Sequence, residues 1–321
     1  MTEVAAAKLA GSGTGACEPD DDAAGLWPAL PLADWKDTCD TLHMWTQIVG
    51  KVRLATTPLV NHWWNVPLYL NARGLTTSPM PYRGRTFELR FDFVQHALVL
   101  ETGDGDVRTM ALAPRTVADF YQSFIGMLRA AGIDVAIWPM PVEVPDPIAF
   151  AQDRAHASYD RDAVQRFWRV LRSVGRVFDV FRAGFIGKCS PVHFFWGSFD
   201  LAVTRFSGRR AVARPGADAI TREAYSHEVS SVGFWPGSGD VSSAAFYAYA
   251  APEPDGYGER AMRPGTAFYD RGLGEFLLMY DDVRTSSSPC ATLLEFCNAT
   301  YDAAAELGRW DRAALERQFA A

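Results

Sequence analysis

The sequence predicts an α+β protein in which two related units, each a helix, an antiparallel meander and a second helix, pack into one compact body. Segments whose apolar residues recur every three or four positions alternate with segments of strand character. Within each unit the strands follow one another directly, which favours antiparallel pairing. The chain of 321 residues is 48% hydrophobic, which is enough to fill a sizeable core.

The first unit is expected over residues 27–144. Apolar residues recur at helical spacing from Trp35 to Val52, and Gly50 is placed to end that helix. The segment "VNHWWNVPLYLNARG" then has strand character, and "TFELRFDFVQHALVLETGDGDVRTMAL" alternates apolar and polar residues between turns, as in a meander. The helical period returns in "TVADFYQSFIGMLRAAGI", and "DVAIWPMPVEV" is the last expected strand.

The second unit is expected over residues 161–321, after a linker at residues 145–160 that carries prolines and polar residues without a period. It begins with a long helix, marked by apolar residues from Val164 to Phe185, that stops at Gly187. Four strand segments follow, "VHFFWGSFDLAVTRFSG", "AYSHEVSSVGFW", "AAFYAYA" and "GEFLLMY". A helix at "PCATLLEFCNATYDAAAELG" completes the unit.

Two stretches, one in each unit, share a pattern that indicates an internal duplication. Each has a Gly-Lys pair at a predicted helix end, Gly50-Lys51 and Gly187-Lys188, followed by a Pro, a His before two aromatic rings, and an apolar strand that ends in Arg. Units of this size fit the usual range for domains. Chance is the alternative, because helix, glycine and strand often follow one another and few residues are identical.

The charge pattern argues against nucleic acid and membranes as partners. The net charge is −7, the isoelectric point is near 5.4, and the charges are interspersed without a basic block. Residues 1–26 are small and acidic without a secretory signal, so we expect a disordered tail. No apolar stretch approaches the roughly 20 residues of a membrane span. A small molecule or a protein is the expected partner, and oligomerisation is left open.

The cysteine pattern predicts reduced thiols in the cytoplasm, with a bacterial cytosol as the default. The chain has five cysteines, an odd number, and no CxxC pair, so no zinc knuckle is expected. Cys189 lies near a histidine, but the helix end before it disfavours a thiolate nucleophile. The cysteines are Cys17, Cys39, Cys189, Cys290 and Cys297.

Lysine is rare in this chain, which makes Lys51 and Lys188 candidates for chemistry. The sequence has 27 Arg and four Lys, yet lysine stands in both Gly-Lys pairs. Because Arg has a fixed charge and a forked geometry, a compact or deprotonatable amine is favoured at these positions. The alternative is structural, since a glycine followed by a cation is a common helix end.

Three histidines are the candidate acids, bases or metal ligands. His62 and His193 each precede aromatic rings at the start of a predicted strand, and His227 lies in another strand. If the two units pack about a pseudo-twofold axis, these imidazoles would line one cleft. Together with Glu228 they would offer zinc or non-haem iron its preferred ligands, although no HExxH or similar spacing supports a metal. Otherwise each is an ordinary packed histidine.

The remaining candidates would bind the ligand. Each unit has a strand-ending arginine, Arg73 or Arg205, which suits carboxylate or phosphate recognition. The alternative is an ordinary surface cation or an ion pair within the fold. Asp200 follows His193 by seven residues and shares its face only if Gly197 bends the strand. The aromatic clusters would wall the cleft or fill the core. The predicted ligand-binding residues are Lys51, Trp64, Arg73, Trp196, Asp200, Arg205 and Trp235.

Several long phrases of the sequence carry a family resemblance. They include "VNHWWNVPLYLNARGLTTSP", "IWPMPVEVPDPI", "GKCSPVHFFWGSFDLAVTRFSG", "REAYSHEVSSVGFWPG" and "FYAYAAPEP". At these places the chain resembles an uncharacterised bacterial family, the domain of unknown function numbered 5996. The resemblance covers nearly everything from Trp27 onward, and it implies a bacterial protein without implying an activity.

The leading expectation is a cytoplasmic enzyme that acts on a small polar molecule with an aromatic or apolar part, in a cleft between the units. The predicted catalytic residues are His193, His227 and Lys188, with Lys188 and Arg205 holding an anionic group. The cofactor is unknown, and a divalent metal, zinc or non-haem iron, is left open. A non-catalytic small-molecule-binding or sensor protein is the rival interpretation, and a structural partner with exposed rings is the third.

Overall fold

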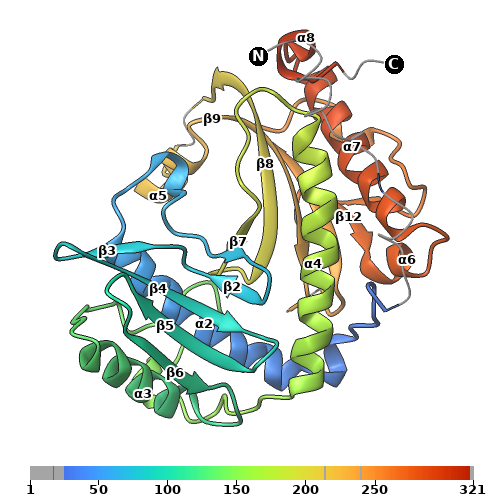
Figure 1. Cartoon of the computed structure of the whole chain (residues 1–321). Helices are drawn as coiled ribbons and strands as arrows, with labels where there is room; N and C mark the ends of the chain where they lie inside the picture. Colours follow the sequence, from blue (N-terminus) through green and yellow to red (C-terminus); the bar gives the residue numbers. More distant parts are fainter. Residues whose placement is uncertain (1–16, 18–24, 213–214, 239–240, 319–321) are drawn as a thin grey trace, which may run out of the picture.

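Two antiparallel sheets, one in each half of the chain, organise the structure, a computed structural model that describes residues 17, 25–212, 215–238 and 241–318 (Figure 1). Each sheet has six strands, with a helix before it and a helix after it. The predicted α+β class, with helix, antiparallel sheet and helix in each half, is confirmed.

The first sheet is a meander with one strand off the main path. The elements of this half are η2 (Leu32–Asp34), α2 (Lys36–Thr56), η3 (Asn61–Trp63), β1 (Tyr69–Leu70), β2 (Gly74–Thr76), β3 (Met80–Tyr82), β4 (Arg85–Asp92), β5 (Ala97–Thr102), β6 (Val107–Ala111) and α3 (Val117–Ala130). The strands lie in the order β1-β2-β4-β5-β6, and β3 pairs with β4. The hydrophobic face of α3 and the buried residues of α2 complete the core of this half.

The second sheet has the order β11-β12-β10-β9-β8-β7. The elements of this half are η4 (Phe150–Gln152), α4 (Arg161–Ala183), β7 (His193–Phe195), β8 (Asp200–Arg210), α5 (Ala219–Ala224), β9 (His227–Trp235), β10 (Ala245–Ala251), η5 (Tyr257–Glu259), β11 (Phe268–Asp270), β12 (Glu275–Met279), α6 (Tyr280–Arg284), α7 (Pro289–Leu307) and α8 (Arg312–Leu315). Helices α4 and α7 pack against one face of this sheet, which leaves the opposite face for the loop that follows α2.

Gly50 does not end the first helix, contrary to the sequence prediction. Helix α2 continues to Thr56, so Gly50 and Lys51 lie inside it. The physical reason is packing, because a Cβ on Gly50 would lie 2.3 Å from Cδ1 of Trp196. A glycine is therefore required where α2 and the Trp196 ring meet.

The second Gly-Lys pair also lies away from a helix end. Helix α4 ends at Ala183 with Gly184 as its C-cap residue. Gly187-Lys188 belongs to the loop that leads to β7, and the backbone N–H of Phe206 donates to the Lys188 carbonyl at 3.0 Å. The two Gly-Lys pairs occupy different positions in their units, so they do not mark equivalent helix ends.

The segment predicted as one strand around His193 is a hairpin. Its β7 and β8 arms are joined at residues 196–199, where Phe199 has a φ of 60° and its N–H donates to the Phe195 carbonyl at 2.8 Å. His193 pairs with Ala202, and Phe195 pairs with Asp200. Because paired residues in an antiparallel ladder point to the same side, His193 and Asp200 share a face of the sheet.

The segment "DVAIWPMPVEV" is not the strand that its composition predicts. Pro139 and Pro141 lack the N–H groups that a sheet ladder needs. The backbone of Val142 is instead satisfied by the Gln47 side chain of α2, whose Oε1 accepts at 2.9 Å and whose Nε2 donates at 2.8 Å. This segment therefore lies against α2 and does not pair with the edge of a sheet.

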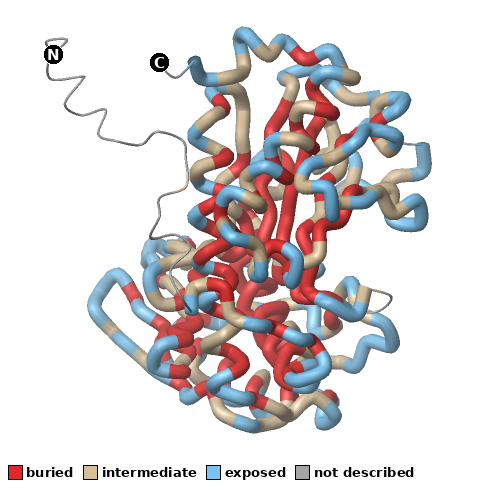
Figure 2. Tube along the Cα trace, turned by 90° about the vertical axis from the view of Figure 1, so that its right-hand side faces the viewer, coloured by how far each residue is buried: buried red, intermediate tan, exposed pale blue. Residues whose placement is uncertain are grey.

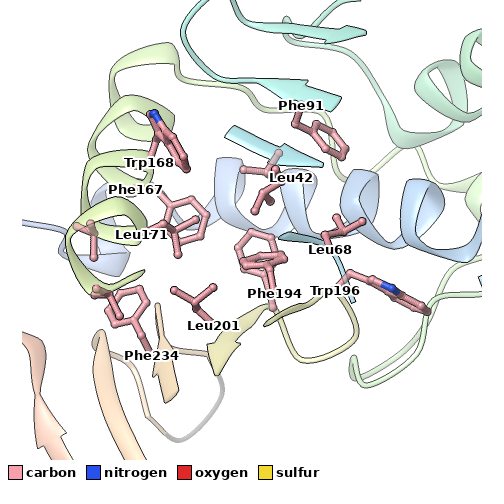
Figure 3. Packing of buried hydrophobic residues seen from close by; sticks show 14 of the residues in the cluster. Leu42, Leu68, Phe91, Phe167, Trp168, Leu171, Phe194, Trp196, Leu201 and Phe234 are labelled. Carbon is pink, nitrogen blue, oxygen red and sulfur yellow. The ribbon is translucent and has the colours of Figure 1, made fainter. Parts of the chain in front are cut away.

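The two halves share one hydrophobic core, which crosses their junction (Figure 3). Leu68 and Phe194 form an isolated antiparallel bridge, with N–H to carbonyl distances of 2.9 and 2.8 Å. Phe150 of η4, within the expected linker at residues 145–160, is buried against Tyr121 of α3. Figure 2 shows buried stretches running through the centre of the molecule.

A disulfide between Cys17 and Cys290 corrects the prediction that all five cysteines are reduced. Cys39, Cys189 and Cys297 are free thiols. The bond attaches the N-terminal segment to α7, although residues 1–16 and 18–24 of the predicted tail lie outside the described residues. Among the residues that the structure describes, no helix has the length and apolar character needed to cross a bilayer.

Candidate functional site

The loop after α2 holds His62 in an unusual backbone conformation. His62 and the following Trp63 both have positive φ, at 60° and 61°. For residues with a Cβ, the left-handed region costs about 1–2 kcal/mol each. Such strain persists only where surrounding contacts fix the chain, and it is frequent at functional sites. His62 lies in the short turn η3 and not at the start of a strand as predicted.

The imidazole of His62 is oriented by the end of a short helix. Its Nδ1 lies 3.1 Å from the carbonyl oxygen of Glu223 and 3.1 Å from that of Ala224, in the last turn of α5. Carbonyl oxygens only accept hydrogen bonds, so Nδ1 carries the proton and donates it. The lone pair of Nε2 is therefore available on the other side of the ring.

Lys188 contacts this lone pair. Its Nζ lies 2.6 Å from Nε2 of His62, so the amine donates and the imidazole accepts. The same amine lies 5.2 Å from the ring centroid of Trp64 and 4.9 Å from that of Phe206. Aromatic faces attract a cation without neutralising it. Within the described part of the chain, no carboxylate forms an ion pair with Lys188.

His227 lies beside the Lys188–His62 pair and completes a cluster of three nitrogen bases. The ring centroids of His62 and His227 are 5.5 Å apart, in an edge-on arrangement. His227 is the first residue of β9 and pairs across the sheet with Arg210. The sequence places His62 in the first half and Lys188 and His227 in the second, so the cluster forms only where the halves meet.

Burial lowers the basicity of all three groups, and the charge of Lys188 adds to the effect on the two histidines. Desolvation lowers the pKa of Lys188. Desolvation and the charge of Lys188 lower the pKa of His62, and the same two effects, with Arg210, lower that of His227. All three shifts favour the uncharged form. At neutral pH both imidazoles are therefore neutral, and Lys188 loses its proton more readily than an exposed lysine.

The surface next to the cluster consists of aromatic rings and tyrosine hydroxyl groups. Phe206, Val229 and Ala251 form a small apolar cluster against which Trp64, Tyr225 and Tyr249 pack. The hydroxyl oxygens of Tyr225 and Tyr249 are 3.0 Å apart, and Tyr249 stacks on Tyr247. These residues lie on the face of the second sheet opposite α4 and α7. They extend from Lys188 toward the start of β8.

At the start of β8 a second polar group surrounds Asp200. The hydroxyls of Ser198 and Tyr247 both donate to its carboxylate. Burial raises the pKa of Asp200 to about 6. Burial and the charge of Asp200 raise the pKa of Glu275 to about 7. Asp200 is six residues from Phe206 along β8, about 20 Å in an extended strand, so it lies outside the Lys188 cluster.

His193 does not join His62 and His227, contrary to the prediction. Its ring lies edge-on to Trp64, with centroids 5.8 Å apart, and is 1% exposed. Desolvation, with the charges of Arg53 and Arg182, lowers the pKa of His193 to about 3. Its imidazole is therefore neutral and enclosed, and the Trp64 ring lies next to both His193 and His62.

The two predicted anion-binding arginines also lie elsewhere. Nε of Arg73 forms an ion pair with Oδ2 of Asp92 in the first sheet at 2.5 Å. Arg205 lies under the helices, with its guanidinium carbon 3.4 Å from the ring centroid of Phe181 and 4.3 Å from that of Tyr301. Strand alternation explains this placement, because Arg205 precedes Phe206 and so points to the opposite face.

Lys51, Trp196 and Trp235 do not contact the Lys188 cluster. Nζ of Lys51 lies 5.4 Å from the ring centroid of Trp196, whose Nε1 donates to the carbonyl of Val66 at 2.9 Å. These contacts fix the turn between β7 and β8 against the first half of the chain. Trp235 is the last residue of β9, at the opposite end of that strand from His227.

The predicted metal centre does not assemble. His62 is bonded to Lys188 and to two carbonyl groups, His193 lies across the Trp64 ring, and Glu228 forms an ion pair with Arg209 at 2.6 Å. Over the described ranges, no three His, Cys, Asp or Glu side chains are grouped so that they could hold a metal ion. The reason is the alternation of β9, which directs Glu228 away from its neighbour His227.

Two hollows lie away from this cluster. The larger, about 330 Å³, is between α4 and β1, where Tyr69, Trp168, Arg172 and Asp179 contribute to its wall. A smaller one, about 160 Å³, is lined in part by Glu228. The candidate functional site is therefore defined by the contacts of Lys188 and not by either hollow.

Sequence reasoning missed Phe206, Tyr225 and the carbonyl groups of α5. Phe206 follows Arg205 in a predicted strand, so alternation alone separates the two and could have indicated it. Tyr225 lies two residues before His227, in the same quoted segment. The α5 carbonyls leave no signal in residue type, because a backbone oxygen is common to all residues.

The chain belongs to a family described as a family of unknown function, DUF5996, whose model matches residues 27–317. No curated protein matches the chain, and no solved structure does. The family assignment agrees with the resemblance noted in the sequence, and it brings no activity with it.

Proposed function

We propose that this member of an uncharacterised family is an enzyme that binds a small anionic molecule with an apolar or aromatic part at the Lys188–His62 pair and acts on it by acid–base chemistry. One observation carries the proposal: Nζ of Lys188 lies 2.6 Å from Nε2 of His62, held by an imidazole and two aromatic faces. Its charge is left without a carboxylate partner in the described residues, so an anion has an attractive place to bind.

The electrostatics of the site favour an anionic ligand. Lys188 and Arg210 both act on the pKa of His227, which places two positive charges around one imidazole. Arg210 is exposed, and no ion pair of the described residues includes it. An anion of appropriate size could contact both cations. The half-buried surroundings strengthen such contacts relative to open solvent.

The aromatic residues beside Lys188 support an apolar part in the ligand. Trp64 is only partly buried, and its ring packs against Phe206 at a centroid distance of 5.7 Å. Tyr225 and Tyr249 continue the same surface. A flat apolar group would gain contact area on these rings while its anionic end faces Lys188.

The hydrogen bonds give the pair its acid–base role. The α5 carbonyls fix the proton on Nδ1 of His62, so Nε2 accepts a proton from Lys188 and returns it later. General acid–base catalysis of this kind contributes about 10²–10⁴-fold to a rate. His62 therefore takes the base role that the sequence prediction gave to His193, and His227 stays next to it.

Histidine NMR tests the proposal, with benzoate as the probe. The chain has six histidines, so a sample labelled with ¹⁵N-histidine gives a simple spectrum. Benzoate is expected to shift the His62 and His227 signals, whereas benzylamine, a cation with the same ring, is expected to leave them unchanged. Lys188→Met should abolish the benzoate effect. Equal shifts with both compounds, or shifts that persist in Lys188→Met, would contradict the proposal.

A cytoplasmic location without nucleic-acid partners is part of the proposal. The net charge of −7 and the interspersed charges support it. The Cys17–Cys290 disulfide points the other way, because reducing compartments seldom sustain such a bond. Cell fractionation combined with thiol labelling distinguishes a cytoplasmic location from an oxidising compartment. Recovery of the protein outside the cytoplasm would overturn the proposed location.

A further inference from the structure

Lys188 differs from the other described lysines in the surroundings of its amine. Lys36 has a side chain that is 58% exposed and forms an ion pair with Asp40 at 2.5 Å. Lys51 is buried inside α2 and its amine lies over the Trp196 ring. Of the lysines that the structure describes, Lys188 alone has its amine at hydrogen-bond distance from an imidazole.

We propose that Lys188 is a nucleophile that forms a Schiff base with a small oxo acid, an aldehyde or ketone that carries a carboxylate. The inference rests on the proposed function, because the same anion-binding site would hold the substrate. Three requirements of such a nucleophile are met by the geometry. The amine has a proton acceptor in contact, no carboxylate among the described residues forms an ion pair with it, and it is partly exposed and so accessible.

The reaction balances with the groups that are present. Nε2 of His62 accepts one proton from the Lys188 ammonium, and the amine lone pair forms a bond to the carbonyl carbon while the C=O π electrons move to oxygen. A second proton passes from the nitrogen to that oxygen, which gives a carbinolamine. The imidazolium then returns its proton to the hydroxyl, which leaves as water while the nitrogen lone pair forms C=N. One ammonium and one carbonyl thus give one iminium and one water.

The charges of the site fit an oxo acid through the whole sequence. The positive charge stays in the site throughout: Lys188 carries it as the ammonium, His62 carries it as the imidazolium while the amine and the carbinolamine are neutral, and the iminium carries it at the end. Arg210, near His227, supplies a second cation that does not enter the reaction. Burial lowers the pKa of Lys188, which favours the neutral, reactive form of its amine.

Reductive trapping tests this inference with pyruvate and phenylpyruvate as probes. The full chain is incubated with each probe and sodium cyanoborohydride, and the site of the reduced adduct is mapped by peptide mass spectrometry. The chain has four lysines, so the assignment is direct. A single adduct on Lys188 is expected, with Lys36 and Lys51 unmodified. Equal labelling of the three lysines, or no labelling of Lys188, would overturn the inference.

Two variants separate the chemistry from folding. His62→Gln is expected to slow labelling of Lys188 by about 100-fold and to change its pH dependence, because the proton acceptor is lost. Lys36→Arg, away from the site, is expected to label Lys188 at the wild-type rate. Circular dichroism of His62→Gln checks that its fold is intact. If that variant is folded and labels at the wild-type rate, the role of His62 is refuted.

The outcomes for the two proposals can be told apart. If benzoate shifts His62 and His227 but no adduct forms, the anion site stands and the nucleophile is refuted. If Lys188 is trapped but benzoate and benzylamine act alike, the amine is reactive and the anion site is refuted. Trapping of Lys188 by acetone as fast as by pyruvate would refute the oxo-acid class while keeping the Schiff base.

Discussion

At the scale of single residues, the site depends on which nitrogen of His62 carries the proton. The α5 carbonyls hold Nδ1 at 3.1 Å and so direct the lone pair of Nε2 to Lys188. The other tautomer, with the proton on Nε2, would place two donors against each other at Lys188 and two acceptors against each other at the carbonyls. The positive φ of His62 and Trp63 is the backbone cost of presenting the ring in this orientation.

Asp200 is expected to make the free energy of unfolding depend on pH. Burial raises its pKa from 3.8 to about 6. The folded state therefore holds this proton more tightly than the unfolded chain, so the stabilisation is complete below pH 3.8 and is lost as the pH rises to about 6. A shift of about 2 units corresponds to about 3 kcal/mol. Above pH 6 the ionised, buried carboxylate lowers the free energy of unfolding.

We expect Asp200→Asn to raise the free energy of unfolding by about 2–3 kcal/mol at pH 8 and to leave it nearly unchanged at pH 4, as measured by urea denaturation. Asp92→Asn is the matched control. Arg73 and backbone N–H groups lower the pKa of Asp92, so its stabilisation is present above the unfolded pKa and this variant should be less stable at pH 8. A loss of stability in Asp200→Asn at pH 8 would contradict the account.

At the scale of elements, the contact between α2 and the β7–β8 turn decides how the halves meet. Gly50 brings the helix backbone against the Trp196 ring, and Nε1 of that ring donates to the Val66 carbonyl in the loop beyond η3. The same loop carries His62. A helix that stood further from the turn would shift this loop relative to Lys188.

Gly50→Ala and Gly126→Ala form a matched pair that tests this contact. Both glycines lie inside helices, where alanine normally adds about 1 kcal/mol to stability. A Cβ on Gly126 meets no atom within 4 Å, whereas a Cβ on Gly50 would lie 2.3 Å from Trp196. Thermal denaturation should show that Gly126→Ala stabilises and Gly50→Ala destabilises, the latter by about 1–3 kcal/mol. Stabilisation by both would contradict the packing described.

Local patterns predicted the elements better than their ends. The helical periods around Trp45 and Phe178 and the strand alternation around Leu89 correspond to α2, α4 and β4. The prediction that the helix ends at Gly50 was wrong, because this glycine makes room for the ring of Trp196, which is 146 positions away in the sequence. The expected strand with Pro139 failed because a side chain of α2 satisfies that backbone. Both errors come from contacts between distant segments.

The candidate site could be predicted only in part, because part of it also depends on contacts between distant segments. Residue type identified His62, Lys188 and His227 as candidates for acid–base chemistry, and the structure brings these three residues together. Strand alternation, which the sequence contains, separates Arg205 from this group. The enclosure of His193 could not be predicted, because it depends on Trp64 and Tyr69 from the other half of the chain.

At the scale of the whole molecule, the cluster is a product of the junction between the halves. His62 and Trp64 come from the loop after α2, and Lys188 and His227 come from the second half. The Leu68–Phe194 bridge and the common hydrophobic core hold these segments in place. Neither half alone contains the pair. The Cys17–Cys290 disulfide adds a further tie, from the N-terminal segment to α7.

The protonation of His62 tests the central claim most directly. Two-bond ¹H–¹⁵N correlation spectra of ¹⁵N-histidine-labelled protein distinguish the two neutral tautomers from the imidazolium. We predict a neutral ring with its proton on Nδ1 at pH 7, and a rise in the pKa of His62 in Lys188→Met, because the charge of Lys188 lowers that pKa. A proton on Nε2, or a pKa that does not respond to loss of Lys188, would show that the two side chains do not share a site.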